Sequence, residues 1–416
     1  MAHRAVVTGM GCVSPNGIGR ESFAGAIRGG RSGVGKVSLF DPEGLPVTIA
    51  AEVKDFDPTE HLPAKEVARL SRAVPMAIAA STEALEDAGI DWSRLTLEES
   101  RELNVILGTG GGAIEFAERM YHLYYTGQQR KASAHTISTG TIGTMSSELS
   151  MRFGLRGASH VITTGCASST DALGYAFRSI KHGEASIFLV GGVDATIVRG
   201  IMEGFILMRV VSTRRDHRPE AASRPFSGDR DGFVLGEGSW MFVVEDLDRA
   251  RARGARIYGE IGGYGATCDA HHRIRLDESG DEPARAMELA MQEARLSPGE
   301  IGYLAYHGTS TELNDRVETR AVKKAFGAAA LSLPGSSVKS MIGHPQGACG
   351  AAGVAATLLA MRDGFLPPTI NLETADPQCD LDYVANAARP AGFETALCNC
   401  IAFGSKNSAL VLRKLS

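Results

Sequence analysis

The sequence predicts an α/β protein built from two halves of similar architecture. Three observations support this fold class: short apolar strands alternate with helical patterns, the alternation starts again near Ile257, and the two rounds share little letter-for-letter identity. Strands separated by helices in this rhythm are expected to form sheets whose faces are covered by helices. We therefore predict a duplicated architecture rather than a sequence repeat, with the join in the charged segment 246–254 and halves of residues 1–254 and 255–416.

The composition excludes several classes of protein. The chain has 416 residues, enough for a large layered core, and its net charge of −5 provides no general attraction to nucleic acid or to an anionic membrane. No apolar run approaches the roughly 20 residues that span a bilayer, and the N-terminus lacks a basic segment followed by an apolar one. The seven cysteines lack the spacing of a disulfide framework, which indicates free thiols in a reducing compartment, with packing roles for Cys398 and Cys400. We expect a soluble, cytoplasmic protein.

The first half starts with a strand that is closed by a glycine- and proline-rich loop, and its later strands are short apolar runs. Its helices are identified by apolar residues that recur at helical spacing. The expected elements are, in order, a strand at 4–9, helices at 21–28 and 65–88, a strand at 104–107 that runs into the glycines 108–112, helices at 114–125 and 141–153, and strands at 186–191 and 239–245.

The second half repeats this rhythm, and its first strand again leads into a glycine-rich polar loop. On its first helix, Ala286, Leu289, Ala290 and Ala294 lie on one side, as in an amphipathic helix. The expected elements are a strand at 257–264, a helix at 283–295, a strand at 303–306, a helix at 314–326, an alanine- and glycine-rich helix that ends at residue 361, and strands at 398–403 and 408–412.

The strongest chemical signal is a Gly-Cys corner at Cys166. A β-branched run from Val161 ends at this corner, and a helical pattern follows it as far as Ile180. Such a corner lifts the cysteine out of the strand and directs a helix N-terminus at its sulfur. The unpaired N–H groups there lower the pKa of a cysteine and can hold the oxyanion that forms when sulfur attacks a carbonyl. Cys166 is therefore a candidate nucleophile, and the alternative is a small buried hydrophobic residue.

Two histidines in the second half are the candidate partners of this cysteine. His307 and His344 are each expected at a strand end, in a turn beside a glycine, with Lys339 and Glu318 nearby in sequence to organise charge. The alternative for each histidine is a structural role with its hydrogen bonds satisfied. A metal site is not favoured, because the spacing of the cysteine and the two histidines contains no local pair of ligands.

The order of these motifs resembles a known family. The matching stretches are Val6-Thr8-Gly9-Met10-Gly11, Ser14-Pro15-Asn16-Gly17, the segment Arg224-Pro225-Phe226 through Asp229-Arg230-Asp231-Gly232-Phe233-Val234-Leu235-Gly236-Glu237-Gly238, and the Cys166, His307, Lys339/His344 and Phe403-Gly404 motifs. The chain resembles the condensing enzymes of the thiolase fold, specifically the β-ketoacyl-acyl-carrier-protein synthases of the type II class. This resemblance implies a thiolase-like five-layered αβαβα fold of two duplicated halves and a two-fold dimer.

The resemblance also implies the chemistry of the site. Cys166 would take an acyl group from a carrier-protein thioester, with the amides of Cys166 and Phe403 as the oxyanion hole. His307 and His344 would then stabilise the enolate that malonyl carrier protein forms as carbon dioxide leaves, and the acyl chain would grow by two carbons. Substrates would be carried on the phosphopantetheine of acyl carrier protein, and no metal or redox cofactor is expected.

Further roles follow from the same resemblance. Lys339 and Glu318 would form a structural ion pair that holds the histidine turns. Thr309 and Thr311 match positions that hydrogen-bond the phosphopantetheine amides, and Phe403 would also gate entry of the second substrate.

Three departures from the family pattern distinguish this chain. The gating loop contains Lys406, and Pro345 with Gln346 replaces an apolar pair after the second histidine. Gly111 stands where housekeeping elongation enzymes often carry a branched side chain that closes the acyl pocket, so longer or bulkier chains are expected to fit. The alternative is that Gly111 only permits a tight turn. Nucleotide binding by the glycines 108–112 is not favoured, because the dinucleotide-binding spacing is absent.

The basic residues suggest where a carrier protein would dock. We expect some of them to gather around the pocket mouth and to bind the acidic carrier protein, although each is also consistent with an ordinary solvated charge. They are Lys65, Arg69, Arg72, Arg209, Arg214, Arg215 and Arg218.

Three functions remain open from the sequence. The first is fatty-acid elongation by a homodimer, and the second is the active subunit of a type II polyketide or polyene system paired with a chain-length-factor homologue. The third is a non-catalytic scaffold, which the joint presence of Cys166, His307 and His344 disfavours.

Overall fold

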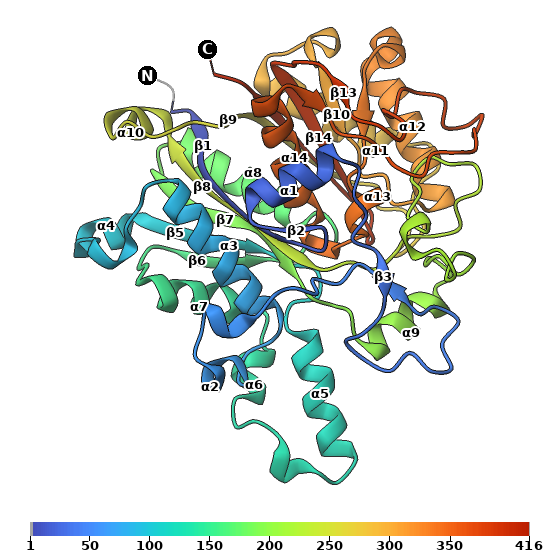
Figure 1. Ribbon diagram of the computed structural model, residues 1–416. Coiled ribbons are helices and arrows are strands. Elements are labelled where there is room, and N and C mark those ends of the chain that lie inside the picture. Colours follow the sequence, from blue (N-terminus) through green and yellow to red (C-terminus); the bar gives the residue numbers. More distant parts are fainter. Residues whose placement is uncertain (1–2, 416) are drawn as a thin grey trace.

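The computed structural model describes residues 3–415, and its strands form one large mixed sheet and two small ribbons (Figure 1). The strands are β1 (Ala5–Ser14), β2 (Gly17–Ile18), β3 (Gly35–Lys36), β4 (Ile49–Ala50), β5 (Leu103–Gly108), β6 (Ser159–Ile162), β7 (Ile187–Asp194), β8 (Gly238–Asp246), β9 (Gly259–Cys268), β10 (Tyr303–Ala305), β11 (Gly335–Ser336), β12 (Phe365–Leu366), β13 (Arg389–Pro390), β14 (Thr395–Ala402) and β15 (Lys406–Arg413). The ribbons are the pairs β3–β4 and β12–β13.

The large sheet contains the same strand order twice. Its order is β11-β10-β14-β15-β9-β1-β8-β7-β5-β6, with β2 paired to the end of β1. Each half contributes five main strands, which are β1, β5, β6, β7 and β8 in the first half and β9, β10, β11, β14 and β15 in the second. Read outward from the middle of the sheet, both halves place these five strands in the order first, fifth, fourth, second, third. The two halves meet where β1 and β9 pair in antiparallel fashion, with Ala5 opposite Ile261. This repeated order confirms the duplicated α/β fold.

The helices complete the layers. They are α1 (Arg20–Arg28), α2 (Ala64–Val67), α3 (Ala73–Asp87), α4 (Leu97–Glu102), α5 (Ile114–Tyr125), α6 (Thr136–Gly140), α7 (Thr144–Phe153), α8 (Ser168–Lys181), α9 (Arg199–Leu207), α10 (Leu247–Ala252), α11 (Asp281–Ala294), α12 (Glu312–Phe326), α13 (Lys339–Ile342) and α14 (Cys349–Asp363). Helices α3 and α7 cover the outer face of the first half of the sheet, and α11 covers the outer face of the second half with α12 packed against it. Helices α8 and α14 contact each other and both halves of the sheet, which makes the arrangement the five-layered αβαβα fold.

Small residues allow the two central helices to approach the neighbouring strands closely. In α8, a Cβ atom on Gly174 would lie 2.5 Å from the ring of Tyr264 on β9, so this close approach requires glycine. Helix α14 is almost entirely buried and consists mainly of alanine and glycine in its first half. Because both helices begin at the same end of the molecule, their first residues lie near each other beneath the site described below.

Two predicted helices differ from the structure. The helix predicted at 65–88 is divided into α2 and α3, because Pro75 lacks an amide hydrogen and its ring would clash with the carbonyl of Ser71 in a continuous helix. The helix predicted at 141–153 begins at Thr144, after the separate short helix α6. Helices α5 and α6 project from the body of the molecule (Figure 1). Within residues 3–415, no helix has the length and apolar character needed to cross a membrane.

Candidate active site

Cys166 lies at the tip of the turn between β6 and α8. Gly165 adopts φ of +65°, a left-handed conformation that glycine reaches without strain, and it turns the chain out of the strand direction. The hydroxyl of Ser168 closes this turn by donating to the carbonyl oxygen of Gly165 (2.5 Å) and accepting from the amide of Thr164 (2.9 Å). Because α8 begins at Ser168, the cysteine lies at a helix N-terminus, as predicted.

His307 follows β10 and is held from two sides. On one side, Glu318 of α12 accepts hydrogen bonds from the main-chain amides of His307 (2.6 Å) and Gly308 (2.7 Å), and from the side chain of Asn399 (2.6 Å). On the other side, Nζ of Lys339 donates to the carbonyl oxygen of His307 (2.6 Å) and lies 3.4 Å from Nδ1 of its ring. The ammonium group favours an unprotonated Nδ1, which leaves the proton on Nε2.

Lys339 and Glu318 do not form the ion pair that the resemblance implied. Both side chains are buried, but Nζ of Lys339 contacts His307 whereas the carboxylate of Glu318 accepts only neutral N–H donors. Each therefore supports the His307 turn through its own hydrogen bonds. Burial outweighs these hydrogen bonds and raises the pKa of Glu318 to about 7.

His344 lies in the loop between α13 and α14, so the prediction that it ends a strand is wrong. Gly343 before it has φ of +64°, and a Cβ atom there would lie 2.8 Å from the carbonyl oxygen of Val234. The amide of His344 donates to that same oxygen (2.7 Å). The ring of Phe233 packs edge-on against the imidazole, with 5.3 Å between centroids. The glycine-rich segment around Phe233 and Val234 thereby positions this histidine.

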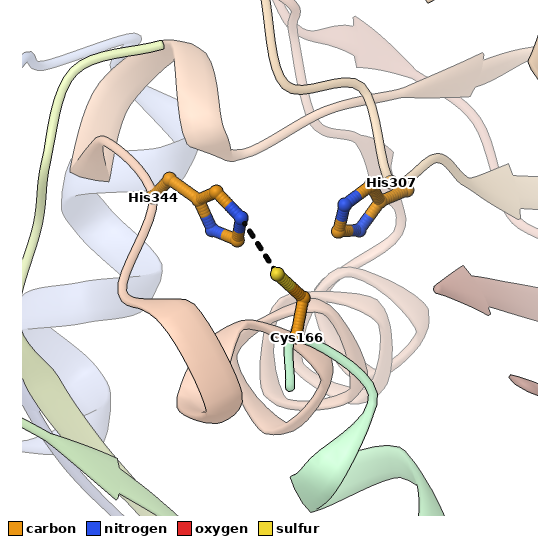
Figure 2. A group of neighbouring side chains, drawn as sticks. All are labelled: Cys166, His307 and His344. Carbon is orange, nitrogen blue, oxygen red and sulfur yellow. Dashed lines mark hydrogen bonds between the residues drawn. The ribbon is translucent and has the colours of Figure 1, made fainter. Parts of the chain in front are cut away.

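Cys166, His307 and His344 converge from three separate parts of the chain (Figure 2). The Sγ atom of Cys166 lies 3.1 Å from Nε2 of His344, and the two imidazole rings are nearly perpendicular with centroids 5.4 Å apart. Burial, followed by the charge of Lys339, lowers the pKa of His307 to about 3, and burial also lowers the pKa of His344. Both imidazoles are therefore neutral near pH 7, and each carries one N–H donor.

The pKa of Cys166 differs from the expectation based on the helix N-terminus. Burial and the neighbouring Cys349 raise this pKa above its usual value, and together they outweigh the opposing effects of Lys339 and the Phe403 amide. The resting sulfur is therefore a thiol. Since Nε2 of His344 lies within hydrogen-bond distance, the thiol proton can move to this ring as the sulfur attacks.

A cavity of about 400 Å³ leads from Cys166 to the surface. Its wall includes Thr309 and Thr311, whose hydroxyl oxygens lie 2.9 Å apart, and the half-buried Phe403. The amide of Phe403 lowers the pKa of the Cys166 thiol, as expected of an oxyanion donor near the reacting atom. The residues predicted to bind phosphopantetheine and to gate the site thus line one cavity with the nucleophile.

Two sets of side chains are close enough to hold a metal ion. The donor atoms of Cys166, His307 and His344 lie within 4.8 Å of one another, and so do those of His307, Cys349 and Cys400. Tertiary contacts thus create a grouping that the spacing in the sequence did not indicate. Nζ of Lys339 lies 3.4 Å from Nδ1 of His307, and its charge would repel a cation there, so we assign no metal ligands.

Family comparisons agree with this geometry. The chain matches the family model of the β-ketoacyl synthase N-terminal domain over residues 2–250 and that of the β-ketoacyl synthase C-terminal domain over residues 258–373. The chain belongs to the β-ketoacyl synthase family.

Relatives of this β-ketoacyl synthase come from two kinds of pathway. The chain is 42% identical to a protein named as a polyketide β-ketoacyl synthase 1 from Streptomyces cyaneus, covering 99% of this chain and 98% of the relative. It is 39% identical to a 3-oxoacyl-[acyl-carrier-protein] synthase 2 from Coxiella burnetii, covering 99% of both. Among solved structures, the ishigamide ketosynthase/chain length factor matches with a TM-score of 0.92 and 33% identity over all of both chains.

Gly111 does not open the cavity of this β-ketoacyl synthase. A Cβ atom at this position would lie 2.2 Å from Cγ2 of Thr196, so a neighbouring side chain already occupies the adjacent space. The amide of Gly111 donates to Asp194 (2.9 Å), and Gly111 is absent from the lining of the cavity. The geometry therefore supports the alternative interpretation, in which close packing in a tight loop requires glycine.

The predicted docking cations do not all gather at the cavity mouth. Arg209 and Arg214 are exposed and line the cavity. Lys65 and Arg69 are also exposed, but they lie at α2, outside the cavity lining, where the carbonyl of Arg69 accepts from Thr139 of α6 (2.9 Å). Among the other predicted cations, Arg72 pairs with the buried Glu237 and Arg215 pairs with Asp229.

Four residues at the site were not predicted from the sequence. Asp194 is fully buried and joins the glycine loop to the start of the α14 segment by accepting from the amides of Gly110 (2.7 Å) and Gly347 (2.6 Å). An acidic residue that ends a buried strand could have indicated this role. The other three are Arg275, which lines the cavity mouth, and Cys349 and Cys400, which lie beside the nucleophile.

Proposed function

We propose that this chain is a β-ketoacyl-acyl-carrier-protein synthase that joins an acyl group to malonyl carrier protein by decarboxylative condensation. The observation that carries the proposal is the convergence of Cys166, His307 and His344 on one cavity, with 3.1 Å between the sulfur and the His344 ring. The family match supports the same reaction.

In the first step, the Cys166 sulfur attacks the thioester carbonyl of an acyl carrier protein. The thiol proton passes through Nε2 of His344 to the departing phosphopantetheine sulfur, so the acyl group moves from one sulfur to another. The oxyanion is held by the amides of Cys166 and Phe403, the latter of which already lowers the pKa of the Cys166 thiol. Thr309 and Thr311 hold the phosphopantetheine arm.

In the second step, malonyl carrier protein occupies the same cavity. Its C–C bond to the carboxylate breaks and carbon dioxide leaves. The enolate oxygen is held by the N–H donor of His307 and by His344 in the tautomer that carries its proton on Nε2. The carbanion then attacks the acyl carbonyl and expels the Cys166 sulfur, which regains a proton. Neutral imidazoles suit this step because they stabilise charge that is absent from the ground state. The reaction requires no metal or redox cofactor.

Intact-protein mass spectrometry with a panel of acyl carrier proteins tests the proposal. Wild type is expected to gain the mass of the acyl group, and Cys166→Ala is expected to gain none. His307→Ala is expected to load normally and to lose condensation by about 100-fold or more, because it removes an enolate donor. Loading of Cys166→Ala, or normal condensation by His307→Ala, would contradict the assigned roles.

A second candidate is the active subunit of a type II polyketide synthase that pairs with a chain-length-factor homologue. The polyketide relative is more similar to this chain than the fatty-acid relative, at 42% against 39% identity. One matched structure is a ketosynthase/chain length factor, and another is a type II ketosynthase in complex with its acyl carrier protein, with a TM-score of 0.90. Co-purification of a cysteine-less homologue would favour this candidate, whereas an active homodimer that elongates saturated acyl groups would favour fatty-acid synthesis.

The proposal includes a subcellular location, the cytoplasm, and a docking surface for the carrier protein. All seven cysteines are free thiols, which suits a reducing cytoplasm. Arg209 and Arg214 at the cavity mouth are placed to meet the acidic carrier protein, and Lys65 and Arg69 would form a separate contact on α2.

A further inference from the structure

Two further cysteines lie directly behind the nucleophile. Cys349 is the first residue of α14 and Cys400 lies in β14, and their Sγ atoms are 3.8 Å apart although 51 residues separate them in sequence. Both sulfurs also lie close to the carbonyl oxygen of Cys166, at 3.3 Å for Cys349 and 3.1 Å for Cys400. The proposed condensation uses neither residue.

The surroundings of this pair favour one thiolate beside one thiol. Burial opposes ionisation of Cys349, yet the hydrogen bond from Cys400 and the charge of Lys339 lower the pKa of Cys349 well below its usual value. Burial and the adjacent Cys349 raise the pKa of Cys400 well above its usual value. A thiolate in contact with a thiol is the arrangement from which oxidation to a disulfide proceeds.

The pair adjoins a small polar cavity. An internal cavity of about 10 Å³ is lined by Cys349, Cys400, Tyr306 and Asn399. The hydroxyl of Tyr306 and Oδ1 of Asn399 are buried without a hydrogen-bond partner. A polar cavity of this size accommodates about one water molecule, so the larger hydrogen peroxide enters only as the surrounding side chains move. The two sulfurs need to approach by less than 2 Å to reach the disulfide bond length of about 2.05 Å.

We propose that Cys349 and Cys400 are a site of reversible oxidation, at which a hydroperoxide forms a disulfide that switches off the adjacent nucleophile. The thiolate of Cys349 attacks a peroxide oxygen, the O–O bond breaks and a sulfenic acid forms on Cys349. The departing hydroxide becomes water by taking up the proton that the Cys349 thiol released. The Cys400 sulfur then attacks this sulfur, forms the S–S bond and releases a second water. Two thiols and one hydrogen peroxide thus give one disulfide and two waters, and a dithiol reverses the change.

The disulfide affects the nucleophile through the main chain. Neither sulfur of a disulfide carries a proton, so the Cys166 carbonyl loses the S–H donor of Cys400. Moving Cys400 toward α14 also shifts β14 at a position three residues before Phe403, whose amide lowers the pKa of the reacting sulfur. We expect loading of Cys166 to fall at least tenfold. This regulatory effect rests on the proposed function, whereas formation of the disulfide does not.

Titration of the full chain with hydrogen peroxide, in buffer that contains a metal chelator, tests the disulfide. Intact mass is expected to fall by about 2 Da, to recover with dithiothreitol, and to map to a linked Cys349–Cys400 peptide. The same loss is expected in Cys166→Ala and in the control Cys379→Ala, which removes a buried cysteine outside this cluster. It is expected to be absent from Cys349→Ala and Cys400→Ser, whose thermal unfolding shows whether each variant is folded.

Each outcome decides the proposal. Absence of the 2 Da loss in wild type, its persistence in Cys349→Ala, or its disappearance in Cys166→Ala would overturn the assigned pair. Unchanged acyl loading by fully oxidised wild type would overturn the switch while leaving the disulfide. Failure of the reduced protein to load any acyl group would count against the proposed function alone, because the disulfide is measured by mass in the same sample.

Discussion

Individual residues around His307 show how buried charge sets the chemistry of a neutral side chain. Nζ of Lys339 lies 3.4 Å from Nδ1 of the imidazole, and the carboxylate of Glu318 accepts from the main-chain amide of the same residue. These two contacts orient the ring and leave its proton on Nε2, although the two charged groups do not contact each other. Both charged groups are buried. Buried ionisable groups of this kind make the stability of the fold depend on pH.

Glu318 is expected to make the protein less stable as the pH rises. Burial raises the pKa of this carboxyl to about 7, so its contribution to stability is fully present below the unfolded pKa of about 4.5 and is lost as the pH rises through 7. Between pH 5 and 8, the free energy of unfolding of wild type should fall relative to Glu318→Gln by about 3 kcal/mol, an order-of-magnitude figure.

Urea unfolding at several pH values measures this difference. Glu288→Gln, on the exposed face of α11, is the matched control and should follow wild type. A constant difference between wild type and Glu318→Gln across this range would show that the carboxyl does not titrate there.

At the scale of elements, the glycine loop 108–112 after β5 packs closely against residues 194–196 at the end of β7. The space that a side chain at Gly111 would take is filled by Thr196, and Asp194 holds the loop through the amides of Gly110 and Gly111. The hydroxyl of Thr196 is buried and has no hydrogen-bond partner. The two positions therefore behave as one packing unit.

Gly111→Ala is expected to destabilise the protein by about 1–3 kcal/mol, because its Cβ would overlap the Thr196 methyl group. The double variant Gly111→Ala/Thr196→Ala should recover most of this loss, since the second change removes the overlapping atom. Thermal unfolding of both single variants and the double variant gives the coupling directly. Additive effects of the two changes would show that the contact does not limit this position.

At the scale of the whole molecule, the projection formed by α5 and α6 presents apolar side chains to solvent. Tyr125 is 87% exposed and Ile137 is 79% exposed, and Tyr121 is more than half exposed. Large exposed apolar side chains gathered on one projection are typical of an association surface. We expect this projection (Figure 1) to contact the dimer partner in the proposed function.

Tyr125→Asp/Ile137→Asp is expected to abolish association with the partner subunit, because charges would enter an apolar interface. Light scattering after size-exclusion chromatography should show wild type as a dimer, or as a monomer that dimerises when a chain-length-factor homologue is added. The control Leu331→Asp changes a side chain that is 70% exposed elsewhere and should associate as wild type does. A dimeric double variant would place the interface on another surface.

Arg209 and Arg214 carry positive charge at the cavity mouth. Arg209→Glu and Arg214→Glu are each expected to raise the KM for acyl carrier protein about three- to tenfold and to leave the KM for a small acyl thioester unchanged, since only the carrier protein presents an acidic surface to these arginines. The effect should shrink at high salt. Lys65→Glu tests the separate surface on α2, and equal KM values in all variants would remove these residues from docking.

The sequence by itself determined the alternation of strands and helices, the corner at Cys166 and the motifs of the site, because these depend on local periodicity and on residues close together in the chain. Only the tertiary structure decided which residues from distant segments of the chain contact each other. His344 follows a short helix because packing against Val234 sets its loop, and Lys339 and Glu318 approach His307 from opposite sides. Thr196 fills the space beside Gly111, and Cys349 meets Cys400 across 51 residues of sequence. Such contacts arise when helices and sheet pack in three dimensions, and single-sequence patterns do not encode which side chains then share one space.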